Sequence, residues 1–295
     1  MIKPYRTEKT SDKSQETVVG SPTNGVEHEG VFDPTKPANP KHRPQTWVPW
    51  GGLGPWVVVV YALLVFGIAS TLAAVLLVLY AHLSGLGGHS ADSWLTNSVV
   101  AQFWYVLTAE ALTFCAIWGF LRLRKTGLRS IGWRGVRFWD PIVALIAYVV
   151  YFVAYLVLLA VVTHLIPSIN INQKQDLGFS NVSGTMNLVL TFLSLVVLPP
   201  LVEETVFRGF VFTGLRTRLK WVWAAIITSL LFASAHLLES ASGQPLLWVA
   251  GIDTFTLSIV LCYLREETDS LWPGVFVHGL KNGIAFLTLF IFHIK

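Results

Sequence analysis

Charged residues are scarce in this sequence of 295 residues. Only 13% are Asp, Glu, Lys or Arg, whereas 53% are hydrophobic, and the mean hydropathy is +0.58. A typical soluble domain carries about twice that share of charged residues. The composition therefore excludes an ordinary soluble globule and predicts a helical bundle embedded in a membrane.

Cysteine is nearly absent as well, and so are several catalytic signatures. Cys115 and Cys262 each lie in an apolar run. Two such cysteines cannot build a disulfide framework, so we expect them to be packing residues. The sequence also lacks the HExxH motif of zinc peptidases, the GxSG motif of serine enzymes and the GxGD motif of aspartyl intramembrane enzymes.

Large apolar residues are few in residues 1–46, which are rich in Pro, Lys, Glu, Ser and Thr. Such a composition cannot bury enough surface to offset the entropy of ordering. We expect a disordered cytoplasmic tail there and a membrane domain at 47–295. Because the first ~20 residues show no apolar core with a cleavage site, the first span is expected to direct insertion. Trp47, Trp50 and Trp56 are typical of an interfacial belt.

Apolar runs that can cross a bilayer as a helix, which takes ~20 residues, recur along the rest of the chain. We expect about seven spans, at roughly 56–82, 98–121, 142–166, 187–215, 221–239, 246–264 and 273–293. The fourth is too long for a simple span, and we expect Pro199-Pro200 to break it. The predicted fold class is an all-α transmembrane bundle with a proline-broken helix.

The net charge of +4 reflects basic loops between the predicted spans and does not indicate a nucleic-acid partner. The loop 122–137 carries six basic residues, whereas 83–97 carries none. Because short basic loops stay in the cytoplasm, the 122–137 loop and the amino terminus are predicted to be cytoplasmic. The acidic loop 265–271 is the exception to this pattern.

The stretch PPLVEETVFRGF at 199–210 places ionisable residues inside the fourth span. A charge at that depth costs several kcal/mol unless it is paired. Positions four apart nearly eclipse on a helix, so Glu204 and Arg208 share a face and Glu203 points elsewhere. Either the pair is a structural lock and Glu203 is merely hydrogen-bonded, or Glu203 is kept for chemistry.

Three polar residues in later spans likewise have two possible roles, one structural and one functional. Counted from the predicted cytoplasmic ends of their helices, His236 and Glu204 reach a similar depth, so an acid and an imidazole can meet. His278 and Asn282 lie four apart on one face of the last span. Each of the three is either an interhelical hydrogen-bonding residue or a member of a site.

Glu110, Asp253 and Lys281 also lie within predicted spans. Ionisable residues at such positions are rare and usually paired. We assign them no chemistry and expect structural pairing, for instance between Asp253 and Lys281.

Hydrolysis of a peptide bond in a bilayer would use residues of these types. It needs held water, a base that removes its proton, and donors for the oxyanion. Pro199 and Pro200 free backbone carbonyls, which a membrane tolerates only where protein or a water-filled cavity satisfies them. The stretch 199–210 is therefore predicted to be the wall of a wet cavity.

The segments EETVFRG, FASAH and HGLKN occur in this order on three late helices. Together they resemble the EExxxR, FxxxH and HxxxN motifs of the CAAX-protease and bacteriocin-processing family of intramembrane proteases. The resemblance covers roughly 185–290. It implies that Glu204 and Arg208 hold the geometry of the site.

The resemblance also implies roles for the other motif residues. Glu203 and His236 would activate a water, and His278 and Asn282 would support the developing oxyanion. A zinc-dependent variant stays open, because Glu203, His236 and His278 are zinc ligands in type and number.

The expected function is that of an intramembrane endopeptidase that cleaves membrane-anchored peptides or proteins. The expected location is a bacterial or archaeal cell membrane. The alternative within the same fold is a non-catalytic bacteriocin-immunity or scaffolding protein. A transporter is disfavoured, because it would predict internal repeats and none is visible.

Overall fold

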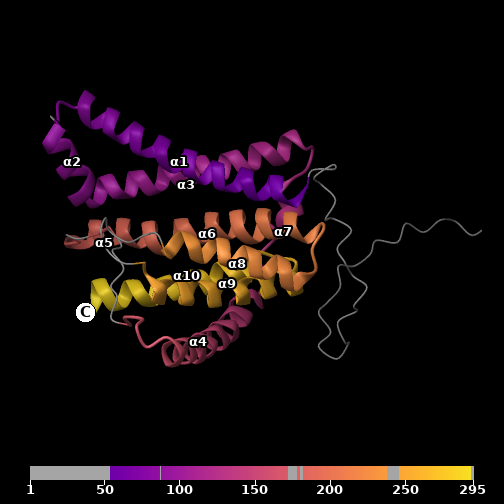
Figure 1. Cartoon of the computed structure of the whole chain (residues 1–295). Helices are drawn as coiled ribbons and strands as arrows, with labels where there is room; N and C mark the ends of the chain where they lie inside the picture. Colours follow the sequence, from indigo (N-terminus) through magenta and orange to yellow (C-terminus); the bar gives the residue numbers. More distant parts are fainter. Residues whose placement is uncertain (1–53, 87, 172–177, 180–181, 238–245, 294–295) are drawn as a thin grey trace, which may run out of the picture. The chain divides into compact units, whose positions relative to one another are not determined.

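The computed structural model describes residues 54–86, 88–171, 178–179, 182–237 and 246–293 (Figure 1). All of its regular elements within these ranges are helices. The described residues fall in one compact unit, Pro44–Lys295. The predicted tail at 1–46 lies outside the described residues, as do Trp47 and Trp50 of the predicted belt; Trp56 points outward at the start of the first helix.

Six helices are long and apolar enough to cross a membrane: α1 (Pro55–Leu83), α3 (Val99–Leu123), α4 (Asp140–Leu165), a composite helix at Gly184–Arg216, α9 (Trp248–Thr268), and α10 (Trp272–Phe286) with η4 (Leu287–Ile291). A seventh apolar helix, α8 (Trp221–Leu237), is shorter. The predicted all-α transmembrane bundle is confirmed, with six long helices and one shorter helix at the seven expected places. The chain is an integral membrane protein.

The composite helix does not leave its helical path at Pro199-Pro200. It passes through α5 (Gly184–Phe192), the π-helical η2 (Leu193–Val197), α6 (Leu198–Glu204), the π-helical η3 (Thr205–Val211) and α7 (Phe212–Arg216). The break predicted at the prolines takes the form of wider π turns immediately before α6. Such turns are frequent at functional sites.

Two short elements were not expected from the sequence. The predicted loop 83–97 contains α2 (Gly88–Asn97), a polar helix without an apolar run, and η1 (Leu128–Ile131) lies in the basic loop after α3. Hydrophobic periodicity cannot signal helices of this kind, because they have no wide buried face.

The helices pack in layers around the composite helix (Figure 1). The α1–α3 pair lies on one side of it, α8, α9 and α10 lie on the other, and α4 packs against α9 and α10. The main core joins α1, α3, η3 and α8 through buried side chains that include Ile117, Phe210 and Phe232. Cys262 is part of this core, whereas Cys115 is exposed, so only one of the two cysteines packs as expected.

Ion pairs explain why the loop 265–271 is acidic. Asp269 pairs with Arg134 and, at 2.7 Å, with Arg265. Glu266 accepts hydrogen bonds from both Nε and Nη2 of Arg216, at 2.9 and 2.5 Å. The acids thus pair with Arg134 of the 122–137 loop, with Arg216 at the end of the composite helix and with Arg265 of α9. The cytoplasmic location of the 122–137 loop stays a prediction.

Gly132 lies where the basic loop meets the buried Arg265 guanidinium. Its φ is +96°, and a Cβ there would lie 2.7 Å from Arg265 Nε. Its carbonyl accepts from the Leu271 amide at 3.0 Å, just before α10. Only glycine adopts this conformation without strain.

We predict that Gly132→Ala lowers the free energy of unfolding by about 1–3 kcal/mol, the cost of a strained left-handed residue, with the Arg265 contact adding to it. The measurement is thermal unfolding of the purified protein in detergent. Gly135→Ala is the matched control, because its Cβ would meet nothing within 4 Å and its φ is not positive. Equal melting temperatures for the two variants would contradict this account.

Candidate active site

A buried ion pair lies at the centre of the bundle. Glu204 Oε1 accepts from Arg208 Nη1 at 2.8 Å, and the two side chains are 0% and 1% exposed. The pairing inferred from their spacing is confirmed. The guanidinium carbon of Arg208 also lies 4.4 Å from the centroid of the Phe232 ring, a cation–π contact that connects the composite helix to α8.

His278 of α10 lies between the two glutamates. Its Nδ1 is 3.0 Å from Glu204 Oε1, the oxygen that accepts from Arg208, and its Nε2 is 3.8 Å from Glu203 Oε2. Because that Glu204 oxygen is an acceptor, Nδ1–H donates to it. In the neutral ring Nε2 is then the nitrogen that accepts a proton, and it faces the Glu203 side.

A glycine lets α10 come this close to the acid. A Cβ at Gly274 would lie 3.0 Å from Glu204 Oε2. This contact is tighter than most side-chain contacts, so a larger residue would push α10 away from Glu204. The small residue one turn before His278 therefore sets the distance between imidazole and carboxylate.

His236 is oriented by its own helix. Its Nδ1 lies 3.0 Å from the carbonyl oxygen of Phe232, so Nδ1–H donates and Nε2 is again the proton-accepting nitrogen of the neutral ring. The Phe232 ring adjoins both imidazoles, with centroids 4.7 Å from His236 and 5.8 Å from His278. The phenylalanine of FASAH thus spaces the two histidines and covers Arg208.

Asn282 satisfies a carbonyl that the prolines leave without a partner. An α-helical bond to Leu195 O would come from residue 199 and a π-helical bond from residue 200, and both are prolines without an N–H. Asn282 Nδ2 donates to Leu195 O at 2.9 Å. The freed carbonyls were expected from the sequence, but this partner was not.

The predicted cavity is present, with a volume of ≈ 480 Å³. Its lining includes all four residues to which the resemblance gives catalytic roles, Glu203, His236, His278 and Asn282. Glu204 and Arg208 lie behind this wall. The structure therefore brings together the residues that the three motifs contribute from separate helices.

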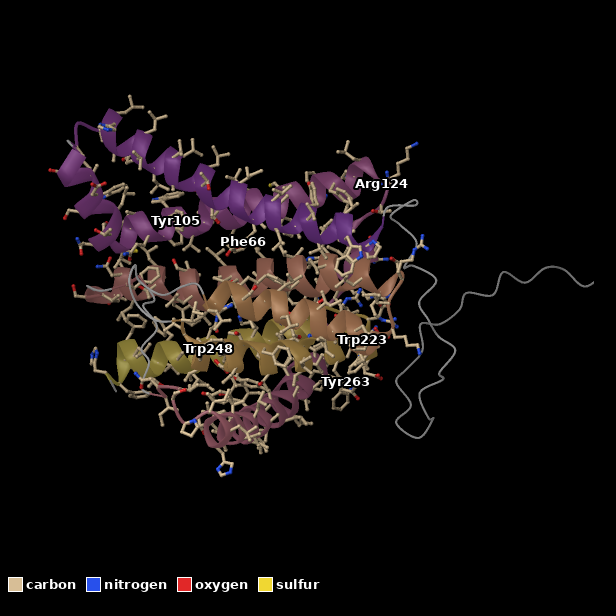
Figure 2. All side chains as sticks on the ribbon, viewed as in Figure 1. Phe66, Tyr105, Arg124, Trp223, Trp248 and Tyr263 are labelled. Atoms are coloured by element: carbon tan, nitrogen blue, oxygen red, sulfur yellow. The ribbon has the colours of Figure 1, made fainter. Side chains whose placement is uncertain are left out.

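The opposite wall comes from α1 and α3. It includes Phe66, Tyr105, Val106, Ala109 and Glu110. Figure 2 shows Phe66 and Tyr105 on the side of the α1–α3 pair that faces α5 and α6. None of these residues was expected at the site from the sequence. The one signal was an acid in the middle of a span at position 110.

Lys281 also lines the cavity, yet its charge is compensated. Its Nζ lies 2.9 Å from Asp253 Oδ2, so the predicted structural pair is confirmed. Tyr151 donates its hydroxyl hydrogen to the same carboxylate from α4. The ammonium group is thus held by Asp253.

The fit of a metal depends on three ligands at suitable positions. Among the described residues, no group of three or more His, Cys, Asp or Glu side chains is placed to hold a metal ion. Zinc bound by Glu203, His236 and His278 stays a prediction, and no step below depends on it.

Comparison with known proteins identifies the segment that carries the motifs. Residues 185–284 match the family described as Type II CAAX prenyl endopeptidase Rce1-like. An uncharacterized 24.3 kDa protein of Escherichia coli is 36% identical over 94 residues, which are 31% of this chain and 41% of that protein. No solved structure gives a significant match. The family match confirms the resemblance that the three motifs indicated.

The bond between Asn282 and Leu195 O generates a double-mutant prediction. Asn282→Ala leaves a buried carbonyl unsatisfied and should lower the free energy of unfolding by about 1–3 kcal/mol. Pro200→Ala supplies the N–H that a π-helical bond to Leu195, a residue of η2, would use, so in that background the same change should cost less than about half as much. The measurement is unfolding of the four proteins in detergent. Equal costs in both backgrounds would show that Asn282 does not replace the proline N–H.

Proposed function

We propose that this protein, whose residues 185–284 match the Rce1-like endopeptidases, hydrolyses peptide bonds of membrane-associated substrates inside the bilayer. One observation carries the proposal. Glu203, His236 and His278, from three helices, line a single cavity within the membrane bundle. An acid and two imidazoles around one space provide a base and polarising groups for water.

Glu203 and His278 are spaced to share a water. The 3.8 Å between Glu203 Oε2 and His278 Nε2 is too long for a direct hydrogen bond. A water between them would be hydrogen-bonded to both, with His236 contacting it from α8. Glu203 takes a proton from this water, and the hydroxide oxygen forms a bond to the substrate carbonyl carbon.

The remaining groups stabilise the products of this attack. The carbonyl oxygen becomes an oxyanion, and the second N–H of the Asn282 amide donates to it. The carbon–nitrogen bond then breaks, and the leaving amine receives the proton held by Glu203. Glu204 and Arg208 act indirectly, because they hold the His278 ring and set its tautomer.

Substitution of the base tests the proposal. Glu203→Gln and His236→Ala should each lower cleavage about 100-fold or more, the usual range for loss of a proton-transfer group. The measurement compares new amino termini of membrane proteins in cells that carry wild type or each variant. Leu230→Ala, an outward-facing change on the His236 helix, is the control. Wild-type cleavage by a folded Glu203→Gln protein would disprove the mechanism.

The non-catalytic immunity or scaffolding role gives the opposite result in the same cells. Binding alone needs no base, so a Glu203→Gln protein would keep the full cellular phenotype, and wild type would generate no new termini. Loss of the phenotype together with loss of the termini supports the endopeptidase.

The proposed mechanism uses side chains alone. We therefore predict that exhaustive chelation of the purified enzyme changes its cleavage rate by no more than about twofold from the rate before chelation, whereas loss of a catalytic group changes it about 100-fold. The measurement is the rate before and after chelation and after addition of zinc. A rate that falls and is restored by zinc alone would replace this mechanism with a metal-dependent one.

A further inference from the structure

A second carboxyl group lines the cavity, and it comes from outside the matched segment. Glu110 lies on α3, and residues 185–284 account for none of the α1–α3 wall. It is 9% exposed, and it lines the cavity that Glu203, His236 and His278 also line. Among the lining residues that the structure describes, it is the one acid on this wall.

Glu110 is not explained as a structural residue. Its Oε2 atom is buried and has no hydrogen-bond partner in the described part of the chain. No ion pair to Glu110 occurs among the same residues, and Lys281, the one Lys or Arg among the described lining residues, is held by Asp253. A buried polar atom without a partner costs about 1–3 kcal/mol, a cost that a hydrogen bond to a ligand in the cavity would offset.

The absence of a counter-ion decides whether the Glu110 side chain is a charged carboxylate or a neutral acid. An unpaired carboxylate buried among apolar helices costs far more than a neutral acid. The neutral acid has one O–H donor and a carbonyl acceptor. Glu110 therefore presents both a donor and an acceptor to whatever occupies the cavity.

Its position on α3 fits an extended ligand. Four of the five described lining residues of this helix, Val106, Ala109, Glu110 and Thr113, follow the i, i+3, i+4, i+7 spacing of one helical face. A peptide between this face and the catalytic wall would have backbone N–H and C=O groups on both sides. In a bilayer each of them needs a partner. Besides the hydroxyl groups of Ser70, Tyr105 and Thr113, the described α1–α3 lining offers one carboxyl group, that of Glu110.

We infer that Glu110 is a substrate-binding residue, a neutral acid that hydrogen-bonds the backbone of the peptide opposite the catalytic wall. This rests on the proposed endopeptidase function. It assigns to α3 a part in holding the scissile bond against Glu203, while proton transfer stays with Glu203 and the histidines.

The neutral state can be tested without any substrate. Dicyclohexylcarbodiimide is an apolar reagent that adds to protonated carboxyl groups in membrane proteins. We expect it to label Glu110 in the purified full-length protein in detergent, as read by peptide mass mapping, and the adduct to be absent from Glu110→Gln. Failure to label Glu110 while other buried carboxyl groups react would overturn the neutral assignment.

The binding role is tested by kinetics. The probe is a synthetic peptide that spans the cleavage site identified through the termini lost in Glu203→Gln cells. Glu110→Leu removes donor and acceptor and should raise KM about tenfold with a smaller effect on kcat. Glu110→Gln keeps an uncharged donor and acceptor and should restore KM to within about threefold, since only bond geometry changes. Cys115→Ala, an exposed position on the same helix, is the control.

Each result has one interpretation. A Glu110→Gln protein as impaired as Glu110→Leu would show that a titrating acid is needed and would overturn the hydrogen-bond role, as would a Glu110→Leu protein with wild-type KM. A wild-type protein that cleaves nothing would instead disprove the proposed function, and the substrate contact would fall with it. The carbodiimide result would still report the state of Glu110.

Discussion

The site depends on the carboxylate of Glu204, which cannot be moved without leaving the buried charge of Arg208 unpaired. Glu204 accepts from Arg208 and contacts His278 through the same oxygen, and Arg208 lies over Phe232. Breaking such a pair from one side typically costs about 3–5 kcal/mol. Because its contacts reach α10 and α8, the pair aligns three helices at once. The catalytic geometry is a consequence of how the buried charge is compensated.

The same helix contains a second constraint, which arises from its backbone. Two prolines remove N–H groups at a depth where no solvent replaces them, and Asn282 donates to the Leu195 carbonyl that is left. The composite helix is thus joined to α10 twice, through Glu204 to His278 and through Leu195 to Asn282. His278 and Asn282 lie one turn apart, so a single face of α10 meets both features. A motif with histidine and asparagine at this spacing is explained by packing before any chemistry is considered.

The parts of the site that sequence predicts are those that depend on local periodicity. The pairing of Glu204 with Arg208 follows from their spacing, and the spans follow from apolar runs. The π turns could not be predicted, because each inserts a residue and rotates the following face by about 100° relative to a regular helix. The position of Glu110 was missed for a different reason. Which face of α3 meets the cavity is decided by its packing against other helices, and the residue carries no motif.

The two walls of the cavity have different origins, and this division bears on substrate choice. The wall built by the matched segment holds the residues to which we assign the proposed hydrolysis. Glu204 contacts His278 on this wall, and Asn282 is bonded to Leu195. The wall built by α1 and α3 contacts no member of that network through a hydrogen bond or ion pair among those described above. The buried Glu204–Arg208 pair thus constrains the residues of the proposed chemistry. The shape and polarity of the wall that would face a substrate are set by α1 and α3, which lie outside the matched segment.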